Sequence, residues 1–547
     1  MLTQRRTFAC GMVACLLFSF VILISICRAE TTDISINIQN ASKTLLPASL
    51  SSAPDIIVNT TSDVIDFGDG RVEDLPGPDG LVSLREAIRA ANATPGPQVI
   101  GFNIPTTDEG FDGMVFTIKV KPFRPLDSLM DDGNTIDGST QTSFTGDTNP
   151  YGPEIVINGD VDAGGGLTIS SAYNVISDLV INGFLNSPHG VGIKHGEAYR
   201  AHHNLVTRCY IGLNATGGSA IPNDGEGVSL GSAAENNMII NNVISGNKGD
   251  GISFYEFQGL STQNNVIQGN YIGTDPTGTN LIGNGRCGIG INLKDFPGFI
   301  DRNIIGGTEI GEGNIIMGNN RGICITTTDV DGNIIQGNII SKNGTGIQLG
   351  GPYAVLNHTI ITENMITENT YDGIAIQSSG NQVLGNVIAY NGDWGLFIFG
   401  LELKNRVSQN SIFSNGYLGI DLGGDGVTLN DPGDVDSGPN EFMNFPVLES
   451  AKATHGRLIV KGTIDTHNPK DVTIEFFANP VPVPGGDPSG HGEGAVFLGT
   501  DRPNPKGKFT ATLPPVDPGT LITATATDAF GNTSEFAANI VAVGPGK

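Results

Sequence analysis

Asn338–Asn343 reads NIISKN, and the pair Gly346-Ile347 follows shortly after it. The same order of Asn, a β-branched pair, a second Asn and a Gly-Ile or Gly-Leu step returns along the chain. Other copies are NVISGN at Asn242–Asn247, NIIMGN at Asn314–Asn319, NMITEN at Asn364–Asn369, NVIAYN at Asn386–Asn391 and NSIFSN at Asn410–Asn415. From Asn314 to Asn410, successive first asparagines lie 24, 26, 22 and 24 residues apart. Short apolar strands separated by turns at this period predict a parallel β-helix.

The repeat region is predicted to extend over residues 99–447, where short apolar strands alternate with Gly, Asn and Asp turns. About 23 residues per coil predicts roughly 15 coils. The gap of 44 residues between Asn270 and Asn314 is interpreted as two periods. We interpret the repeated asparagines as corner residues that tolerate the left-handed conformation and hydrogen-bond along the stack, rather than as a ligand site.

The N-terminal segment, residues 1–29, has a basic start, an uncharged run from Thr7 to Ile26 and a small residue, Ala29. This pattern predicts an export signal. The run of 20 residues is also long enough to span a bilayer, so a cleaved signal peptide and a retained anchor both stay open. Either reading places the chain from Glu30 onward outside the cytoplasm. Residues 30–55, rich in Thr, Ser and Asn, are predicted to be a tether.

Acidic side chains outnumber basic ones by 56 to 29, which gives a net charge of −27. Without residues 1–29 the chain loses three arginines, and 26 basic against 56 acidic side chains leave −30. Such a surface repels nucleic acid and anionic lipid. A polyanionic glycan would need a bridging cation.

Residues 56–98 are predicted to cap the first coil. Ser83 and Glu86 stand three apart and predict a capping box, and Leu84, Ala87, Ile88 and Ala91 share one face of the helix that follows. An amphipathic helix at this position shields the open end of a solenoid.

Residues 448–547 show a different pattern. The segments at 457–463, 472–477, 494–499, 508–513 and 521–527 alternate as half-buried strands between loops rich in Pro, Gly and Asp. They predict an antiparallel β-sandwich of immunoglobulin-like type.

Three cysteines follow the N-terminal segment: Cys209, Cys287 and Cys324. Because their number is odd and they are spread over the repeats, we interpret them as small apolar residues of the interior rather than as a disulfide framework.

Several segments resemble exported bacterial β-helix proteins with an N-terminal LREA motif. The cap GLVSLREAIRAAN at Gly80–Asn92 resembles that motif, with Val82 where the usual motif has Cys. The segments GNYIGTDPTGT at Gly269–Thr279 and TATATDAFGNTSEFA at Thr523–Ala537 are similar to the coils and C-terminal module of that group. The resemblance implies an all-β, right-handed parallel β-helix that is secreted or attached to the cell surface. It implies no common catalytic residues.

An acidic segment lies where the coils are predicted to end. It contains Asp421, Asp425, Asn430, Asp431, Asp434 and Asp436. Oxygen ligands of this density suit Ca²⁺, although no Glu stands at the bidentate position of an EF-hand. The alternative is a solvated acidic loop.

Catalytic candidates are sparse. For a Ca²⁺-dependent lyase we consider Arg200, His203 and Arg208, with His202 and Tyr210 beside them. If His202 and His203 lie in a strand, they point to opposite faces and cannot both face one substrate. Asp131-Asp132 and Gly490-His491-Gly492, the elements of a polygalacturonase-type hydrolase, fall in different domains.

Aromatic residues suggest a carbohydrate platform. Trp394, the sole tryptophan, lies near Phe397 and Phe399, and Tyr255 lies in an earlier coil. Stacking in the interior is the alternative. The hypothesis is therefore a non-catalytic protein that binds glycan or a cell envelope, with a Ca²⁺-dependent polysaccharide lyase as the alternative.

Overall fold

The computed structural model describes residues 53–547 except 69, 160–161, 187–188, 195–200, 232, 256–259, 292–298, 327–329, 352–357, 455, 480–488 and 545–547. The predicted signal or anchor (1–29) and nearly all of the predicted tether lie outside the described residues. Within the described part, no helix combines the length and apolar character needed to cross a bilayer.

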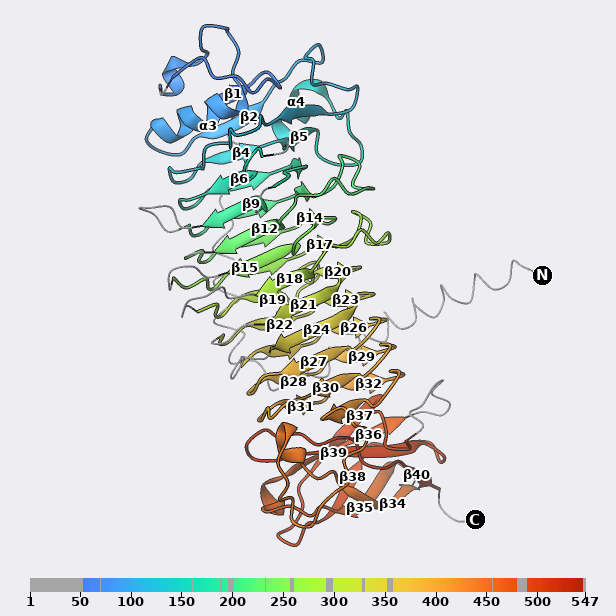
Figure 1. The fold of residues 1–547 in the computed structure, drawn as a ribbon. Helices are drawn as coiled ribbons and strands as arrows, with labels where there is room; N and C mark the ends of the chain where they lie inside the picture. The colour runs from blue at the N-terminus through green and yellow to red at the C-terminus, as the bar shows by residue number, and fades with distance from the viewer. Residues whose placement is uncertain are drawn as a thin grey trace, which may run out of the picture. The chain divides into compact units, whose positions relative to one another are not determined.

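Each coil contributes one short strand to each of three parallel sheets, which stack along one axis from blue to orange in Figure 1. The fold is therefore a right-handed parallel β-helix, as predicted. In one coil, Ile361, Ile366 and Ile374 point inward from the three sheets, directly under Ile335, Ile340 and Ile347 of the coil before. All six are fully buried, so stacked isoleucines supply the dry interior.

The three sheets are named A, B and C in the order in which a coil passes through them. Sheet A contains β1 (Ile56–Val58), β2 (Val99–Phe102), β4 (Thr135–Asp137), β7 (Val175–Ser177), β10 (Leu205–Thr207), β13 (Met238–Ile240), β16 (Val266–Gln268), β19 (Ile304–Gly306), β22 (Ile334–Gln336), β25 (Ile360–Thr362), β28 (Gln382–Leu384) and β31 (Arg406–Ser408). Sheet B contains β3 (Phe116–Lys119), β5 (Ile155–Asn158), β8 (Leu179–Asn182), β11 (Tyr210–Ile211), β14 (Val243–Ile244), β17 (Tyr271–Ile272), β20 (Ile315–Met317), β23 (Ile339–Ser341), β26 (Met365–Thr367), β29 (Val387–Ala389) and β32 (Ser411–Phe413). Sheet C contains β6 (Leu167–Ile169), β9 (His189–Lys194), β12 (Glu226–Gly231), β15 (Ile252–Tyr255), β18 (Cys287–Ile291), β21 (Arg321–Ile325), β24 (Thr345–Gly350), β27 (Ile374–Gln377), β30 (Leu396–Ile398) and β33 (Ile420–Leu422).

The stack has fewer coils than the period predicted. Sheets A, B and C hold 12, 11 and 10 strands among the described residues. The backbone N–H of Asn270 donates to Oδ1 of Asn314 at 3.0 Å, so the 44-residue gap is one coil and not two. Its extra residues lie in long connections, one of which folds into a turn closed by a bridge between Thr274 and Leu281.

The repeated asparagines form buried ladders, as predicted. Asn338 illustrates the pattern: its Nδ2 donates to Oδ1 of Asn364 at 2.9 Å, and its own Oδ1 accepts the backbone N–H of Asn314 at 3.0 Å. The left-handed conformation falls mostly on the residue before the ladder position, as at Lys342 (φ 56°) and Glu363 (φ 55°). The corner and the ladder are thus separate, adjacent positions.

The Gly of each Gly-Ile step lies where neighbouring coils approach closely on sheet C. A Cβ on Gly322 would stand 2.5 Å from the carbonyl oxygen of Gly346, and one on Gly346 would stand 2.4 Å from that of Gly373. Both distances are too short for any side chain, so the column requires glycine.

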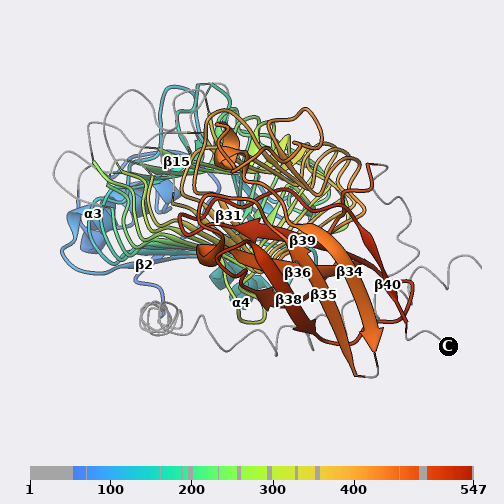
Figure 2. The same ribbon diagram turned by 90° about the horizontal axis from the view of Figure 1, so that it is seen from below.

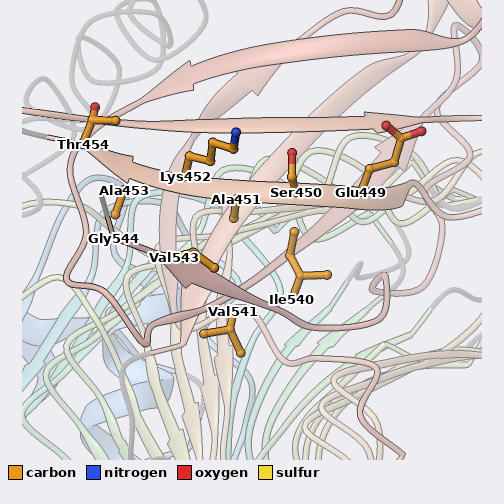
Figure 3. Close-up of a pocket in the computed structure, with 10 residues that line it drawn as sticks. All are labelled: Glu449, Ser450, Ala451, Lys452, Ala453, Thr454, Ile540, Val541, Val543 and Gly544. Carbon is orange, nitrogen blue, oxygen red and sulfur yellow. The ribbon is translucent and has the colours of Figure 1, made fainter. Parts of the chain in front are cut away.

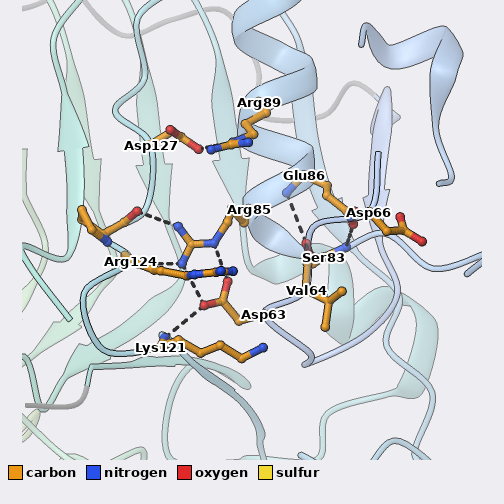
Figure 4. Close-up of polar contacts among 11 residues, drawn as sticks. Asp63, Val64, Asp66, Ser83, Arg85, Glu86, Arg89, Lys121, Arg124 and Asp127 are labelled. Carbon is orange, nitrogen blue, oxygen red and sulfur yellow. Dashed lines mark hydrogen bonds and ion pairs between the residues drawn. The ribbon is translucent and has the colours of Figure 1, made fainter. Parts of the chain in front are cut away.

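The N-terminal cap is built on α3 (Leu84–Ala93), which begins with the predicted capping box between Ser83 and Glu86. The buried Arg85 pairs with Asp63 through two contacts of 2.7 and 2.8 Å and also donates to the carbonyl oxygens of Arg124 and Pro125 (Figure 4). Two further short helices are η1 (Val72–Asp74), which precedes α3, and α4 (Ser139–Thr145), which lies between β4 and β5. The sequence pattern had not predicted α4.

The C-terminal module follows η2 (Pro439–Phe442) and contains seven strands and η3 (Pro469–Asp471). Its strands are β34 (Val447–Thr454), β35 (Arg457–Thr463), β36 (Thr473–Asn479), β37 (Val496–Asp501), β38 (Lys508–Leu513), β39 (Leu521–Thr527) and β40 (Ile540–Val543). They run in the order β37-β36-β39-β40-β34-β35-β38, and all pairs are antiparallel except β34 with β40 (Figure 2).

The C-terminal module closes the last coil through three buried glutamates. Glu493 accepts the backbone N–H of Asn415 at 2.8 Å, Glu475 accepts that of Gln409 at 2.8 Å, and Glu535 accepts that of Leu422 at 2.9 Å. Burial raises the pKa of Glu535 to about 8, against the opposing effect of its backbone hydrogen bonds. The module therefore supplies the acceptors that a further coil would have supplied.

Cys287 and Cys324 form a disulfide, with Cα atoms 6.2 Å apart. The prediction of two free interior thiols was wrong for this pair. They are 37 residues apart and lie on the adjacent strands β18 and β21, whose paired residues, such as Ile289 and Ile323, are 34 positions apart. Cys209 is free and fully buried, as predicted, and burial raises the pKa of its thiol to about 12.

Candidate functional site

Four aromatic rings form a continuous stack on the outside of sheet C in the last coils. The ring of Trp394 lies on that of Phe397, with centroids 4.7 Å apart and planes inclined by 23°. Phe397 in turn stacks on Phe399 at 4.8 Å, and Tyr417 of the next coil lies 5.2 Å from Trp394. Trp394, Phe397 and Phe399 are half-buried and Tyr417 is 54% exposed, so the stack presents ring surface to solvent.

Strand alternation places these rings outside. In β30, Leu396 and Ile398 point into the dry interior and are fully buried, so Phe397 between them points out. The prediction had left an interior stack open as the alternative. The structure places the rings on the outer face, where the backbone at Gly424 passes against Phe397.

Carboxyl groups flank the aromatic stack. Trp394 Nε1 donates to Oδ2 of Asp421 at 2.8 Å, and burial raises the pKa of Asp421. Asp372 precedes Gly373 in the neighbouring coil, and its Oδ1 is buried without a hydrogen-bond partner. Burial and the charge of Asp393 raise the pKa of Asp372 to about 6. The stack thus has hydrogen-bonding groups beside it that sequence reasoning had not associated with it.

Tyr255 does not belong to the stack. It lies on β15, and the strands β18, β21, β24 and β27 separate it from β30. Five strand spacings correspond to about 24 Å. Tyr255 packs over Gly231 of the coil before, and burial raises its pKa, which indicates a packing residue.

Three of the six predicted metal ligands converge. Carboxylate oxygens of Asp431, Asp434 and Asp436 all lie within 4.8 Å of one another. Burial, together with the charges of nearby Asp residues, raises the pKa of Asp434 and of Asp436. Oδ1 of Asp436 is buried without a hydrogen-bond partner. These three residues are termed the acidic cluster.

The other three predicted ligands lie elsewhere. Asp421 binds Trp394 and the backbone N–H of Gly424. Asn430 is held in two hydrogen bonds to the backbone of Phe445, and Asp425 is exposed. A run of acidic residues predicts a local concentration of negative charge. The spacing of these residues in the sequence does not reveal the turn that brings Asp431, Asp434 and Asp436 together.

The predicted catalytic residues are not brought together. Arg200 lies outside the described residues. Arg208 forms an ion pair with Asp178 at 2.6 Å, at the opposite end of β10 from His203. Asp132 Oδ1 accepts the backbone N–H of Ala172 near the first coils, whereas His491 lies against Phe445 in the C-terminal module.

The prediction that His202 and His203 point apart was wrong. His203 has the left-handed conformation (φ 57°), so strand alternation does not apply at this corner. The Nδ1 atoms of the two rings lie 2.8 Å apart.

A cavity of about 500 Å³ opens between β34 and β40 of the C-terminal module (Figure 3). Its walls include Ala451, Ala453, Ile540, Val541 and Val543, and Glu449 and Lys452 carry its charges. The cavity contains no histidine, cysteine or aromatic ring among its described lining residues.

Comparisons with known proteins found likenesses to several solved structures and to one family model. Structures similar to this chain include the Azotobacter vinelandii mannuronan C-5 epimerase AlgE6 A-module, with 15% identity over 62% of this chain and 84% of that chain and a TM-score of 0.42. The AlgE4 A-module from the same organism has 17% identity over 66% and 100% of the two chains and a TM-score of 0.42. Pectate lyase Pel9A has 13% identity over 69% and 82% and a TM-score of 0.27. Residues 276–434 match the model of the NosD family, described as a periplasmic copper-binding protein.

Proposed function

We propose that this chain is an exported β-helix protein that binds glycan without catalysis, through the stack of Trp394, Phe397, Phe399 and Tyr417. The observation that carries the proposal is the continuous run of partly exposed rings on one outer face. Flat apolar ring faces bordered by hydrogen-bonding groups suit the faces and hydroxyls of sugar rings.

The charges beside the stack favour a neutral glycan. The negative charge of Asp393 acts on Asp372, and that of Asp425 acts on Asp421. Carboxylates accept hydrogen bonds from sugar hydroxyls but repel uronate or sulfate groups. A hydroxyl-rich neutral polysaccharide is therefore the ligand class we propose.

Export is supported by two features. Residues 1–29 have the pattern of an export signal, and the Cys287–Cys324 disulfide is of a kind that persists in oxidising compartments. The C-terminal strand order supports an immunoglobulin-like module, since β34, β35 and β38 would form one layer and β36, β37, β39 and β40 the other.

The glycan proposal is tested by comparing Trp394→Ala with Tyr390→Ala on an array of neutral and acidic polysaccharides. Tyr390 is 55% exposed and contacts Phe413 away from the stack, so it is a matched control. Loss of the central ring should weaken binding about tenfold, equivalent to about 1.4 kcal/mol. Tyr390→Ala should bind as the wild type does.

Three results would contradict the glycan proposal. The wild type could bind no glycan, Trp394→Ala could bind as tightly as the wild type, or both variants could lose binding equally. A product with unsaturated uronate absorbance, formed from any acidic glycan with Ca²⁺, would instead support the lyase alternative.

We further propose that the acidic cluster binds Ca²⁺ with a structural role beside the C-terminal module. Its three carboxylates offer the hard oxygen ligands that Ca²⁺ prefers, and a bound cation would relieve their mutual repulsion. A ligand at 100 times its Kd stabilises the folded state by about 2.7 kcal/mol.

Chelator should therefore lower the melting temperature of the wild type by several degrees. Asp436→Asn should melt at the same temperature with and without chelator, because it removes one of the three carboxylate ligands. Asp425→Asn, an exposed position outside the cluster, should keep the full response. An unchanged wild-type midpoint would show that Ca²⁺ has no such role.

The description of the matching family names copper, but the matched segment offers few ligands for it. Within residues 276–434, the described histidine is His358, which contacts Asp331 at 2.9 Å. The two cysteines there are joined as a disulfide. We therefore do not place a copper site in this segment.

A further inference from the structure

His202 and His203 stand side by side at the corner that leads into β10. Their Nδ1 atoms are 2.8 Å apart and their ring planes are nearly perpendicular, at 85°. Both side chains are partly exposed. The arrangement arises because His203 takes the left-handed conformation of the corner position, which turns its ring toward that of His202.

The neighbouring coils hold this pair on both sides. The backbone N–H of Tyr173 donates to the carbonyl oxygen of His202 at 3.0 Å. The backbone N–H of His203 donates to the carbonyl oxygen of Glu235 at 3.2 Å. The ring of Tyr173 also stacks on that of His203, with centroids 5.0 Å apart. Contacts with the neighbouring coils thus fix the positions of the two imidazoles.

The separation of the two nitrogens matches that of adjacent ligands around one metal ion. Imidazole nitrogen binds transition metals at about 2.0 Å. Two such ligands at 90° to each other, as in tetragonal coordination, lie about 2.8 Å apart. The charge of Glu235 acts on His203, and Oε1 of Glu235 accepts a hydrogen bond from Gln263 Nε2 at 3.2 Å.

We propose that His202 and His203 chelate a divalent transition metal ion through their Nδ1 atoms, with Cu²⁺ bound most tightly. Nitrogen ligands in a tetragonal arrangement favour Cu²⁺ and Ni²⁺, and affinity rises toward Cu²⁺ along the divalent series. Water would complete the coordination. The site lies outside residues 276–434, so the family match does not cover it.

The test is a titration of the exported chain with Cu²⁺, followed by calorimetry and electron paramagnetic resonance. Saturating Ca²⁺ is present to compete with Cu²⁺ for the acidic cluster. The wild type should bind one Cu²⁺ with coupling to two nitrogens. His203→Asn, which tolerates the left-handed corner, should bind at least 100-fold more weakly while melting as the wild type does. His358 also has the left-handed conformation (φ 37°), but Thr359 and not a second histidine follows it. His358→Asn should therefore leave Cu²⁺ binding unchanged.

The proposal fails if the wild type shows no nitrogen coupling, which would leave the pair as a simple hydrogen bond. It also fails if His203→Asn binds Cu²⁺ as tightly as the wild type or if His358→Asn weakens binding equally. Glycan binding is measured separately, so either result leaves the proposed function untouched.

Discussion

Arg85→Met is expected to lower the free energy of unfolding of the N-terminal coils by about 3–5 kcal/mol. Arg85 and Asp63 are 2% and 5% exposed, and Arg85 is held by four hydrogen bonds. Removing the guanidinium leaves the Asp63 carboxylate buried without its counter-charge. Urea denaturation, with amide hydrogen exchange across α3, measures the loss.

The same helix provides the control for this prediction. Arg89 pairs with Asp127 at 2.7 Å, but the two side chains are 33% and 36% exposed. Arg89→Met should cost less than about 1 kcal/mol. The double variant Asp63→Leu/Arg85→Met should recover much of the loss, because no charge is left buried. Equal losses at Arg85 and Arg89 would contradict this account.

Asn338→Leu is expected to destabilise the middle coils by at least about 3 kcal/mol. The side chain is 1% exposed and donates to the carbonyl oxygens of Ile305 and Gln336 as well as to Asn364. Leu has a similar size but makes none of these bonds, and each buried group left unpaired costs about 1–3 kcal/mol. Thermal melts and local hydrogen exchange measure the effect.

Asn320→Leu is the matched control for the ladder, since Asn320 is exposed and adjacent to the ladder residue Asn319. It should change stability by less than about 0.5 kcal/mol. If Asn338→Leu and Asn320→Leu melted at the same temperature, the ladders would be dispensable and the fold would depend on the isoleucine interior alone.

The architecture was predictable because each coil repeats the same local chemistry. The Asn ladders, the Gly step and the stacked isoleucines recur in register, so one coil such as residues 334–350 contains the physical reasons for all of them. The capping box at Ser83 is likewise local. Coil length was harder to predict, because long connections such as the one after β17 change the spacing without changing the stack.

The features that escaped prediction depend on contacts between coils or between modules. The disulfide joins residues 37 positions apart on adjacent strands, and no local pattern marks that separation as a contact. Asp372 and Tyr417 reach the aromatic stack from different coils, and the glutamates that close the last coil come from a separate module. The histidine pair was misread because its geometry depends on one left-handed residue that the strand pattern does not reveal.

The glutamates that close the last coil have a consequence for how proteins of this type can change length. Many interior coils offer one another the same ladder and isoleucine surfaces, whereas the contacts that close the two ends are made by α3 at the start and by Glu475, Glu493 and Glu535 at the finish. A duplication or deletion of one whole coil in the middle would leave both terminal sets of contacts intact. Each such event would lengthen or shorten the stack by about 4.8 Å, so evolution can adjust its reach in fixed increments.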